Sequence, residues 1–246
     1  EVKSCTLESQ GVAMFPDAAT ERGRRHVEEL SRISQGKRLV LFVIQGLQAN
    51  RFVPDIHADP AFSLTLREAS RKGVSIRAAS VDCSPTGVAT LRELDVPVDL
   101  EPVRYVEEDR GSYLLHLYLS EERPLQVGSL GRYTFSPGHY IYVGSAMKGL
   151  ASRTRRHLNR RKRLHWHADY LRSVAEGAWV YPIYSPKRLE CDLAESVSHL
   201  YRVPVKGFGS SDCSCMSHLF HTPRDPRKDP RFVELLLRYR HRIALE

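Results

Sequence analysis

The segment Tyr140-Ile-Tyr-Val-Gly-Ser-Ala146 is the strongest structural signal in this chain. It follows a turn signal at Ser136-Pro137-Gly138, and its aromatic and β-branched residues predict a strand over Tyr140–Val143 that ends at Gly144. The run Ser112–Leu119 has the same aromatic and aliphatic character and predicts a second strand. We therefore expect a small sheet at the centre of this half of the chain.

Outward from these strands, the pattern alternates extended pieces with helices. Turn and cap residues predict extended pieces near residues 125–127 and 132–135, helices over about 150–161 and 166–175, a strand over 178–183, a helix from Ser185-Pro186 to about Leu200, and a last helix from Asp229-Pro230 to about Arg240.

The first hundred residues follow the order β-β-α-β-α-β. The pattern predicts strands over 1–7, 12–15, 39–44 and 74–81, a helix from Glu21 to about Ser34 with Thr20 as N-cap, and a helix from Asp59-Pro60 to about Lys72. The expected fold class is α/β (α+β), with two domains that each hold a small mixed sheet flanked by helices. The aperiodic stretch 94–102 places the boundary near Pro102–Asp109, so we predict domains over residues 1–103 and 109–246.

Composition limits the class of protein. The 246 residues are 41% hydrophobic and 27% charged, which is typical of globular chains and excludes disordered or collagen-like ones. No apolar run approaches the ~20 residues of a membrane-spanning helix, so we expect no membrane partner. Five cysteines indicate no disulfide scaffold, and Glu1–Ser4 does not resemble a signal peptide, so we expect a cytoplasmic location. The absence of an initiator Met is what a fragment or a processed product would show.

The positive charge lies in the second half. Residues 1–105 carry 14 Lys/Arg and 14 Asp/Glu, whereas residues 106–246 carry 23 and 15. Eight of these cations and no acidic residue fall within residues 148–163, where helical spacing predicts one stripe made of Arg153, Arg156, Arg160 and Arg163. We predict contact with nucleic acid, DNA in preference to RNA; the alternative is a solvated helix face. The candidate binding residues are Lys148, Arg155, Arg156, Arg160, Arg161, Lys162 and Arg163.

Two tyrosines, an arginine and a glutamate follow one another along this half. Tyr113 opens the first strand within Gly111-Ser112-Tyr113, and Tyr142 closes the later one within Tyr142-Val143-Gly144. Arg153 and His157 share a face of the next helix, and Glu190 lies near the start of a later one. This order resembles the GIY-YIG nuclease superfamily. The resemblance implies that the two tyrosines, the arginine and the glutamate surround one divalent metal.

The resemblance is closer to a poorly characterised branch of that superfamily. Five segments carry it, in order: Tyr140–Ala146, Arg156-His157-Leu158, His165–Leu171, Glu190-Cys191 and Phe208–Cys215. Two features depart from the superfamily pattern. Ser112 stands where a middle isoleucine is usual, and Tyr113 and Tyr142 lie further apart in the chain than in the usual hairpin.

The chemistry of phosphodiester hydrolysis fits the same residues. The reaction needs an activated water and positive charge on the phosphoryl oxygens. Glu190 is the candidate ligand for Mg²⁺ or Mn²⁺, because hard cations prefer oxygen, and Glu195 is its rival. Arg153 would bind phosphate oxygens bidentately.

A tyrosine can act as a base only if its pKa falls from the usual ~10. We expect Arg153 and the ion to lower the pKa of Tyr113, which would then be the base, while Tyr142 orients water or phosphate and His157 assists as a second donor or acceptor. The alternative is that these tyrosines pack in the sheet, and packing is the role we expect of Tyr140.

Further possible ligands lie downstream. His165 and His167 are two residues apart, which on a helix argues against shared ligation with Asp169, so we expect packing and hydrogen bonding from all three. Cys213 and Cys215, with His218 and His221, offer ligand types that suit zinc, but one intervening residue is a tight spacing. The alternative is a loop with buried free thiols, and the balance is against zinc.

The front half resembles the C-terminal part of the sugar fermentation stimulation protein family. Glu1–Ser4 and the stretch Phe15-Pro-Asp-Ala-Ala-Thr-Glu-Arg-Gly-Arg-Arg-His26 carry the resemblance, which extends to about residue 100. It implies a fold of the PD-(D/E)XK type, with Glu1 and Lys3 as the second half of an incomplete metal site. The aspartate of that motif would precede Glu1, so we expect no cleavage by this half alone. Asp17 is a substitute carboxylate only if it does not serve a turn.

The sequence as a whole predicts an enzyme. We expect a metal-dependent endonuclease, using Mg²⁺ or Mn²⁺, that cleaves DNA with little sequence preference through the second domain. The alternative is a DNA-binding or regulatory protein that uses the basic helix and has no catalytic activity.

Overall fold

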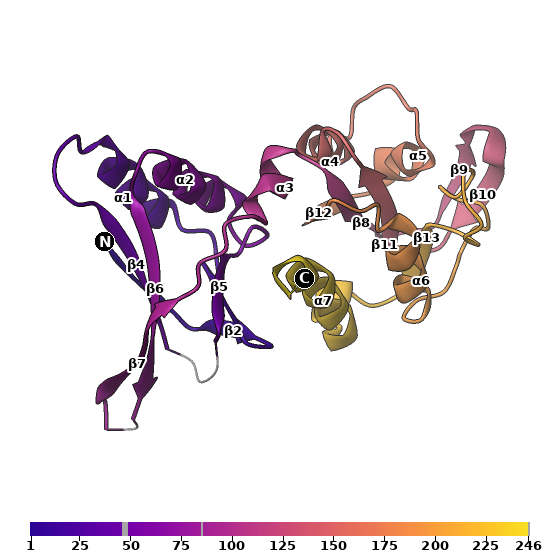
Figure 1. Cartoon of the computed structure of the whole chain (residues 1–246). Coiled ribbons are helices and arrows are strands. Elements are labelled where there is room, and N and C mark those ends of the chain that lie inside the picture. The colour runs from indigo at the N-terminus through magenta and orange to yellow at the C-terminus, as the bar shows by residue number, and fades with distance from the viewer. Residues whose placement is uncertain (46–48, 85, 246) are drawn as a thin grey trace. The chain divides into compact units, whose positions relative to one another are not determined.

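The chain folds into two compact units. The computed structural model describes residues 1–45, 49–84 and 86–245 (Figure 1). Unit 1 comprises Glu1–Glu108 together with the residues from His241 onward, and unit 2 comprises Asp109–Arg240. In the part of the chain that the structure describes, no helix has the length and apolar character that a membrane crossing requires.

Unit 1 is built on two small sheets. Its elements are β1 (Val2–Cys5), β2 (Leu7–Ser9), β3 (Val12–Phe15), α1 (Glu21–Arg32), β4 (Leu39–Ile44), β5 (Arg51–Pro54), α2 (Pro60–Arg71), β6 (Ser75–Cys83), β7 (Ala89–Val96) and α3 (Val103–Glu107). The larger sheet has the order β1-β4-β6-β7, parallel except for β7, and the smaller has the order β2-β3-β5. Helices α1 and α2 lie side by side (Figure 1).

Two predicted caps begin these helices. The Thr20 hydroxyl accepts the Gly23 N–H at 3.2 Å, and Asp59 Oδ1 accepts the Phe62 N–H at 2.9 Å. The other Asp59 oxygen accepts the N–H of Thr20 at 2.8 Å. One carboxylate therefore fixes the start of α2 and the approach to α1 together.

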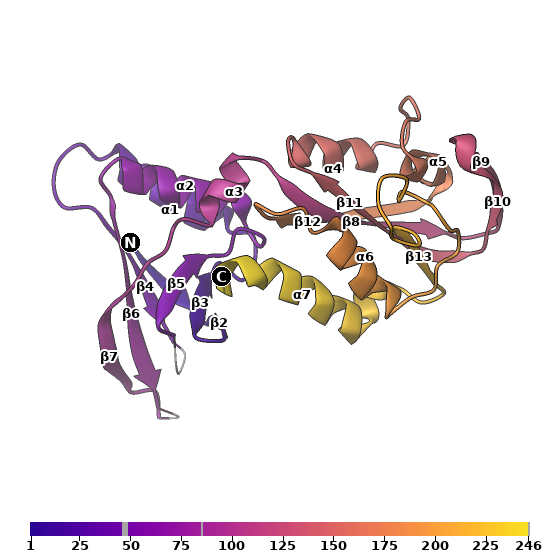
Figure 2. The same ribbon diagram turned by 45° about the vertical axis from the view of Figure 1, so that its right-hand side comes forward.

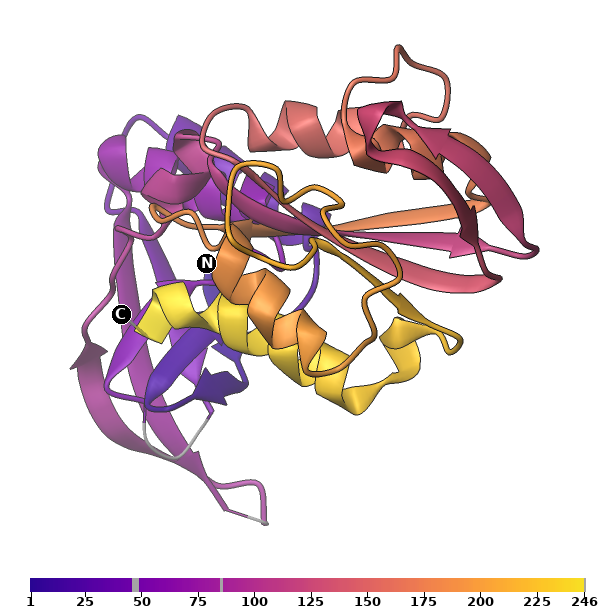
Figure 3. The same cartoon turned by 90° about the vertical axis from the view of Figure 1, so that its right-hand side faces the viewer.

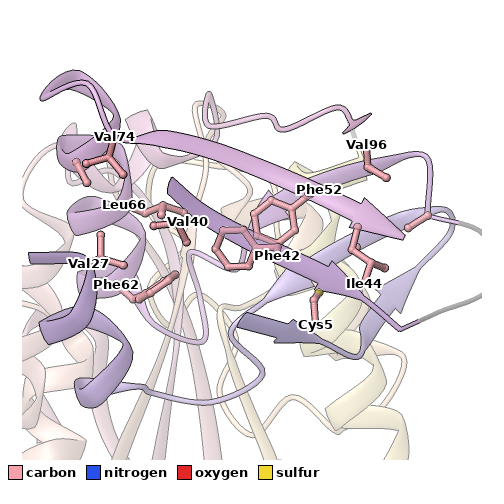
Figure 4. Close-up of a cluster of buried hydrophobic side chains, with 14 residues drawn as sticks. Cys5, Val27, Val40, Phe42, Ile44, Phe52, Phe62, Leu66, Val74 and Val96 are labelled. Atoms are coloured by element: carbon pink, nitrogen blue, oxygen red, sulfur yellow. The ribbon is translucent and has the colours of Figure 1, made fainter. Parts of the chain in front are cut away.

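The core of unit 1 forms between the helices and the larger sheet (Figure 4). Strand β4 contributes Phe42, whose ring stacks on Phe52 of β5 with centroids 4.1 Å apart. Val27 of α1 and Leu66 of α2 are fully buried in the same cluster. Alternate residues of the run over β4 are the fully buried ones, as its place inside the sheet requires.

Unit 2 has one central sheet covered on both faces. Its elements are β8 (Gly111–Leu119), β9 (Arg123–Val127), β10 (Gly131–Phe135), β11 (Gly138–Ala146), α4 (Leu150–Leu158), α5 (His167–Val174), β12 (Gly177–Tyr184), α6 (Glu190–Ser198), β13 (Leu219–Thr222) and α7 (Pro230–Leu245), with short 3₁₀ turns at Gly128–Leu130 and Pro226–Lys228. The sheet order is β12-β8-β11-β13, and every pairing is antiparallel. Helices α4 and α5 lie on one face, and α6 and the unit 2 part of α7 lie on the other (Figures 2 and 3).

The pleat of the two central strands separates the core from the site. Leu114 and Ile141 point into the apolar cluster formed with α6 and α7. Tyr113 and Tyr142, one residue away on each strand, contact His157 of α4 instead. The hydrophobic core of unit 2 and the two tyrosines therefore occupy opposite faces of one sheet.

The predicted fold class, small sheets flanked by helices, is confirmed. The predicted strand over residues 1–7 is wrong in detail, because it divides into β1 and β2. Strands β5, β7 and β13 and helix α3 were not predicted. Strand β7 lacks the alternation of buried and exposed residues that reveals a strand, because every residue but its last is exposed.

Three predicted boundaries in unit 2 are also wrong. Strand β11 runs through Gly144 to Ala146, because all its residues to that point pair with β8. Helix α4 ends at Leu158 rather than Arg161, since Asn159 is already extended. Helix α6 begins at Glu190, well after the predicted Ser185-Pro186 cap, whose serine hydroxyl accepts the N–H of Lys187 in a turn.

Candidate functional site

Tyr113 and Tyr142 stand on the two central strands of unit 2. Tyr113 lies directly across from Gly144 in the register of β8 with β11, and its ring covers that glycine so closely that a Cβ there would overlap it. Gly209 leaves similar room for the ring of Tyr142. The two rings lie 6.4 Å apart between centroids. Each tyrosine ring therefore packs against a glycine, and the two rings lie on the same side of the sheet.

His157 joins Tyr113 from helix α4. The Tyr113 hydroxyl lies 2.8 Å from Nε2 of His157, and both side chains are buried. Burial, with Lys162 nearby, lowers the pKa of His157 to about 3, so its ring is neutral at neutral pH. Its Nδ1 has no hydrogen-bond partner among the described residues and lies 3.7 Å from Asp169 Oδ1.

Glu190 is the first residue of α6, the element that brings a carboxylate to the site. One oxygen accepts the Ser145 hydroxyl at 2.6 Å, and the other lies 3.5 Å from Nδ1 of His218. Burial acts to raise the pKa of Glu190, but the contacts with His218 and Ser145 outweigh it and leave the pKa below its ordinary value. The carboxyl group is therefore ionised at neutral pH.

Several of the side chains described above line one cavity of about 780 Å³. Tyr113, Tyr142, Arg153 and Glu190 contribute to its wall, each from a different element. The guanidinium of Arg153 lies over the Trp166 ring, 4.1 Å from its centroid. The four residues singled out from the sequence as surrounding one centre thus share one hollow.

Arg153 by itself does not bring the pKa of Tyr113 below its ordinary value, and the expected effect of an ion stays a prediction. Burial raises the pKa of Tyr113 above its ordinary value, and the charge of Arg153 offsets only part of that rise. Burial likewise raises the pKa of Tyr142, with the hydroxyl of Tyr113 and the charge of Glu190 adding to the effect. Both phenols are therefore protonated at neutral pH.

Asp169 organises the basic segment that follows α4. This fully buried carboxylate accepts hydrogen bonds from Arg156 at 2.9 Å and from the backbone N–H groups of His165 and Trp166, and it lies 2.8 Å from Lys162 Nζ. Burial alone would raise its pKa, but Lys162 and these donors hold the pKa at about 2. Asp169 is thus a permanent anion that neutralises two of the predicted DNA-binding cations.

The predicted arginine stripe is therefore wrong as a continuous helical face. Helix α4 ends before Arg160 and Arg163, and Arg160 Nε donates to the backbone oxygen of Ser173 at 2.9 Å. The exposed cations of the segment are Lys148, Arg155, Arg160, Arg161 and Arg163. Lys148 and Arg153 also line the cavity.

Of the other predicted residues, some line the cavity and some lie outside it. His165 and His167 both line it, and His167 Nδ1 accepts the N–H of Gly209 at 3.0 Å. Glu195, the rival of Glu190, is exposed and borders a separate hollow. Tyr140 packs against Phe135, and its hydroxyl donates to a backbone oxygen.

The thiols of the long loop before β13 also gather. The ligand atoms of Cys213, Cys215 and His218 lie with that of Cys191 within 4.8 Å of one another. His221 is not in this group: its Nε2 lies 3.0 Å from the Pro137 oxygen and its Nδ1 accepts from Arg202.

Sequence reasoning missed several residues of this region. Ser145 and Trp166 lie inside the segments that carry the resemblance but were given no role. The Ser145 hydroxyl donates a hydrogen bond to Glu190, and the Trp166 ring packs against the guanidinium of Arg153. Asp169 was expected to pack and to form hydrogen bonds, but its pairing with Arg156 and Lys162 was not foreseen. Its position three residues after Trp166, in the first turn of α5, was the available signal for a helix-start role.

In unit 1, Glu1 and Lys3 are in contact. Their side chains pair at 2.8 Å, and His26 Nδ1 lies 2.9 Å from the same oxygen of Glu1. The pairing with Lys3 lowers the pKa of Glu1 to about 2. Asp17 is exposed. A metal role for Glu1 and Lys3 stays a prediction.

The fold and the site define a protein of two α/β units, the second of which carries a cavity walled by tyrosine, arginine and glutamate. The chain belongs to the family described as "Domain of unknown function DUF123", whose model matches residues 112–240. A second model, described as "Sugar fermentation stimulation protein RE domain", matches residues 1–87, and the predicted resemblance of the front half is thereby confirmed.

Three curated relatives each match less than half of the chain. A sugar fermentation stimulation protein homolog of Thermotoga petrophila is 51% identical over 77 residues, which is 31% of this chain and 35% of that protein. The homolog of Methanothermobacter thermautotrophicus is 53% identical over 78 residues (31% and 32%), and that of Chloroflexus aurantiacus is 46% identical over 98 residues (39% and 38%). This chain spans about a third of the length of these relatives.

One solved structure is similar to part of the chain. It is that of Pyrococcus furiosus SfsA in complex with Ca²⁺, at 30% sequence identity and a TM-score of 0.38, covering 40% of this chain and 43% of that one.

Proposed function

We propose that unit 2 is an endonuclease domain that hydrolyses phosphodiester bonds of DNA with the help of Mg²⁺ or Mn²⁺. One observation carries this proposal: Tyr113, Tyr142, Arg153 and Glu190, which come from four elements, wall a single open cavity of about 780 Å³. The resemblance of the same residues to the GIY-YIG pattern supports it.

The cavity offers a hard cation what it needs. Glu190 is ionised, and Asp212, a second carboxylate, lies on the same wall. Magnesium is commonly held by one or two carboxylates and completes its shell with waters and substrate phosphates. Glu190 would hold the ion, which when bound would supply positive charge to the phosphoryl oxygens and a bound water.

The proton of the attacking water has a route through Tyr113. Because the Tyr113 hydroxyl hydrogen-bonds to a neutral His157, it can hand its own proton to Nε2 while it accepts one from water. Asp169, 3.7 Å from the other ring nitrogen, would stabilise the imidazolium that forms. This relay does not require a free phenolate, so the raised pKa of Tyr113 is compatible with the role of base.

Trp166 supports Arg153 beside the cavity. The guanidinium of Arg153 lies over the Trp166 ring, 4.1 Å from the ring centroid. A planar guanidinium binds two phosphate oxygens at once, which neutralises charge that grows in the transition state. We assign Arg153 to the phosphoryl group and Tyr142 to the orientation of water or phosphate.

The exposed cations would guide DNA to the cavity. Lys148 lies just before α4 and borders the cavity itself, Arg155 lies on α4, and Arg161 and Arg163 follow it. Contacts of this kind reach phosphates rather than bases, so we expect little sequence preference. Arg156 and Lys162 serve the fold through Asp169 instead.

A second candidate is a DNA-binding domain without catalysis. The observation that favours it is the burial of both phenols: Tyr113 is 2% exposed and Tyr142 is 7% exposed. A substrate would reach these hydroxyls only through the mouth of the cavity.

The deciding experiment is a nicking assay on supercoiled plasmid with the full chain, with Mg²⁺, with Mn²⁺ and with EDTA. We expect metal-dependent nicking that Glu190→Gln abolishes, while the affinity for the same DNA changes little. Binding without nicking under either ion would refute catalysis and leave the binding domain.

A further inference from the structure

We propose that Cys191, Cys213, Cys215 and His218 form a structural zinc site in unit 2. The four ligand atoms come from two stretches of chain, the first turn of α6 and the loop before β13, and lie within 4.8 Å of one another. A tetrahedral zinc with Zn–S bonds of about 2.3 Å needs sulfur atoms about 3.8 Å apart, so small side-chain movements close the site. The spacing of Cys213 and Cys215, which argued against zinc in the sequence, is offset by Cys191, a ligand 22 positions away on α6.

The donor set selects the ion. Three thiolates and an imidazole are soft ligands, and four of them in a compact group match the closed, four-coordinate sites of zinc rather than those of magnesium or calcium. The exposed Cys191 and the half-buried Cys213 and Cys215 give an ion access from solvent, while His218 closes the site from within. The access from solvent, the number of ligands and their chemical type are therefore all consistent with zinc.

Each ring nitrogen of His218 faces a neighbouring side chain. Its Nε2 lies 3.4 Å from Cys213 Sγ, and its Nδ1 faces Glu190 Oε1 at 3.5 Å. Nδ1 is buried and has no hydrogen-bond partner within the described residues. A zinc-bound histidine commonly directs its second nitrogen to a carboxylate, which fixes the tautomer and the ring. The arrangement around His218 is the one that zinc binding through Nε2 requires.

The thiols of Cys191, Cys213 and Cys215 lie close together. A cation placed among these sulfurs would relieve the repulsion between their ionised forms, and each thiol ligand would release its proton on binding.

The site also explains how a long loop keeps its shape. Residues 199–218 contain no helix or strand, yet they lead into a strand of the central sheet (Figure 3). Two backbone hydrogen bonds, from Gly207 to Met216 and from His218 to Phe208, close the loop on itself. Zinc would join this closed loop to the first turn of α6.

The test is the metal content of the full chain, purified without chelator and measured by mass spectrometry of the elements. We expect about one zinc per chain, which Cys213→Ser and Cys191→Ser each lower at least fivefold. Cys83→Ser is the matched control, because Cys83 is an exposed free thiol of unit 1; its zinc content should stay at that of the unchanged chain.

A second measurement, on the unchanged chain, tests the site even if the cysteine variants do not fold. In the unchanged chain, removal of zinc by a strong chelator should lower Tm by roughly 5 °C or more. Cobalt added afterwards should give the thiolate-to-metal absorption of a tetrahedral site. Three results would overturn the proposal: no zinc bound even after addition of ZnCl₂, iron or copper in its place, or a disulfide among Cys191, Cys213 and Cys215 under non-reducing conditions. None of these bears on Glu190-dependent nicking, so the two proposals fail separately.

Discussion

The hydroxyl of Tyr113 on the central strand β8 lies 2.8 Å from Nε2 of His157 on α4, and both groups are buried. A phenol and a neutral imidazole at this distance form a proton path that leads from the cavity into the protein. The path joins β8 to α4, and the ring of Tyr113 has room for its position because a glycine, Gly144, lies across from it.

Tyr113→Phe should reduce the rate of DNA nicking by about 100-fold or more, because it removes the group that accepts the proton from water. DNA affinity should change little, since the hydroxyl is buried. The matched control is Tyr140→Phe, whose hydroxyl only donates to the backbone oxygen of Ser136. Equal activity of Tyr113→Phe and the unchanged protein would exclude the relay.

Glu190→Gln should abolish Mg²⁺-dependent nicking, because an amide lacks the charge that holds a hard cation. The control is Glu195→Gln on the same helix, an exposed carboxylate that does not line the cavity. A titration of the nicking rate with Mg²⁺ measures both. The role of Glu190 would be refuted if its variant titrated as Glu195→Gln does.

Asp169→Ala should destabilise unit 2 by about 3 kcal/mol or more, because it leaves Arg156 and the nearly buried Lys162 without their shared anion. Urea denaturation measures the loss. Asp192→Ala, an exposed acid in the first turn of α6, should cost less than about 1 kcal/mol. Similar losses in the two variants would show that the Asp169 network contributes little.

Acid should destabilise the protein well before its carboxylates titrate. Burial lowers the pKa of His116 to about 3, with His139, Asp225 and Arg227 around it, and the pKa of His157 falls to the same range. Between pH 6.5 and 3 the unfolded chain therefore binds protons that the folded one does not, so stability is complete above pH 6.5 and falls as the pH is lowered. Each histidine adds up to about 1.4 kcal/mol per pH unit.

The histidine contribution is measurable by urea denaturation at a series of pH values. His116→Phe should flatten the pH dependence between pH 6.5 and 4 and leave the steeper fall near pH 3, to which Asp169 contributes. An unchanged slope in this variant would assign the acid sensitivity to other groups.

Arg155→Ala and Arg161→Ala should each weaken DNA binding in a salt-dependent way. Loss of one phosphate contact reduces the slope of log K against log salt by about 0.9. Arg238→Ala, an exposed cation on α7 that borders a different hollow, is the control and should leave the slope unchanged. Fluorescence anisotropy with a labelled duplex measures all three.

The features that sequence predicted well are those that neighbouring residues determine. Thr20 and Asp59 begin their helices because each cap bonds to an N–H three residues on, a relationship visible in the chain. The run over β4 and the tyrosine-rich strands were likewise found from their own residues.

The features that it missed depend on partners far away in sequence. Cys191 joins Cys213 and Cys215 because α6 and the loop before β13 meet in space, and no local pattern encodes that meeting. Arg156 and Lys162 were predicted as DNA-binding residues because a run of cations does not reveal that Asp169 is buried against two of them. The short strand β13 gains its structure from pairing with β11.

Gly144 and Gly209 have a consequence for how the domain tolerates change. A single methyl group at either position would collide with a phenol ring, so even alanine would shift a tyrosine that we propose to be catalytic while the fold around it survived. The proposed cleavage chemistry is thus most vulnerable at two positions that have no reactive group of their own.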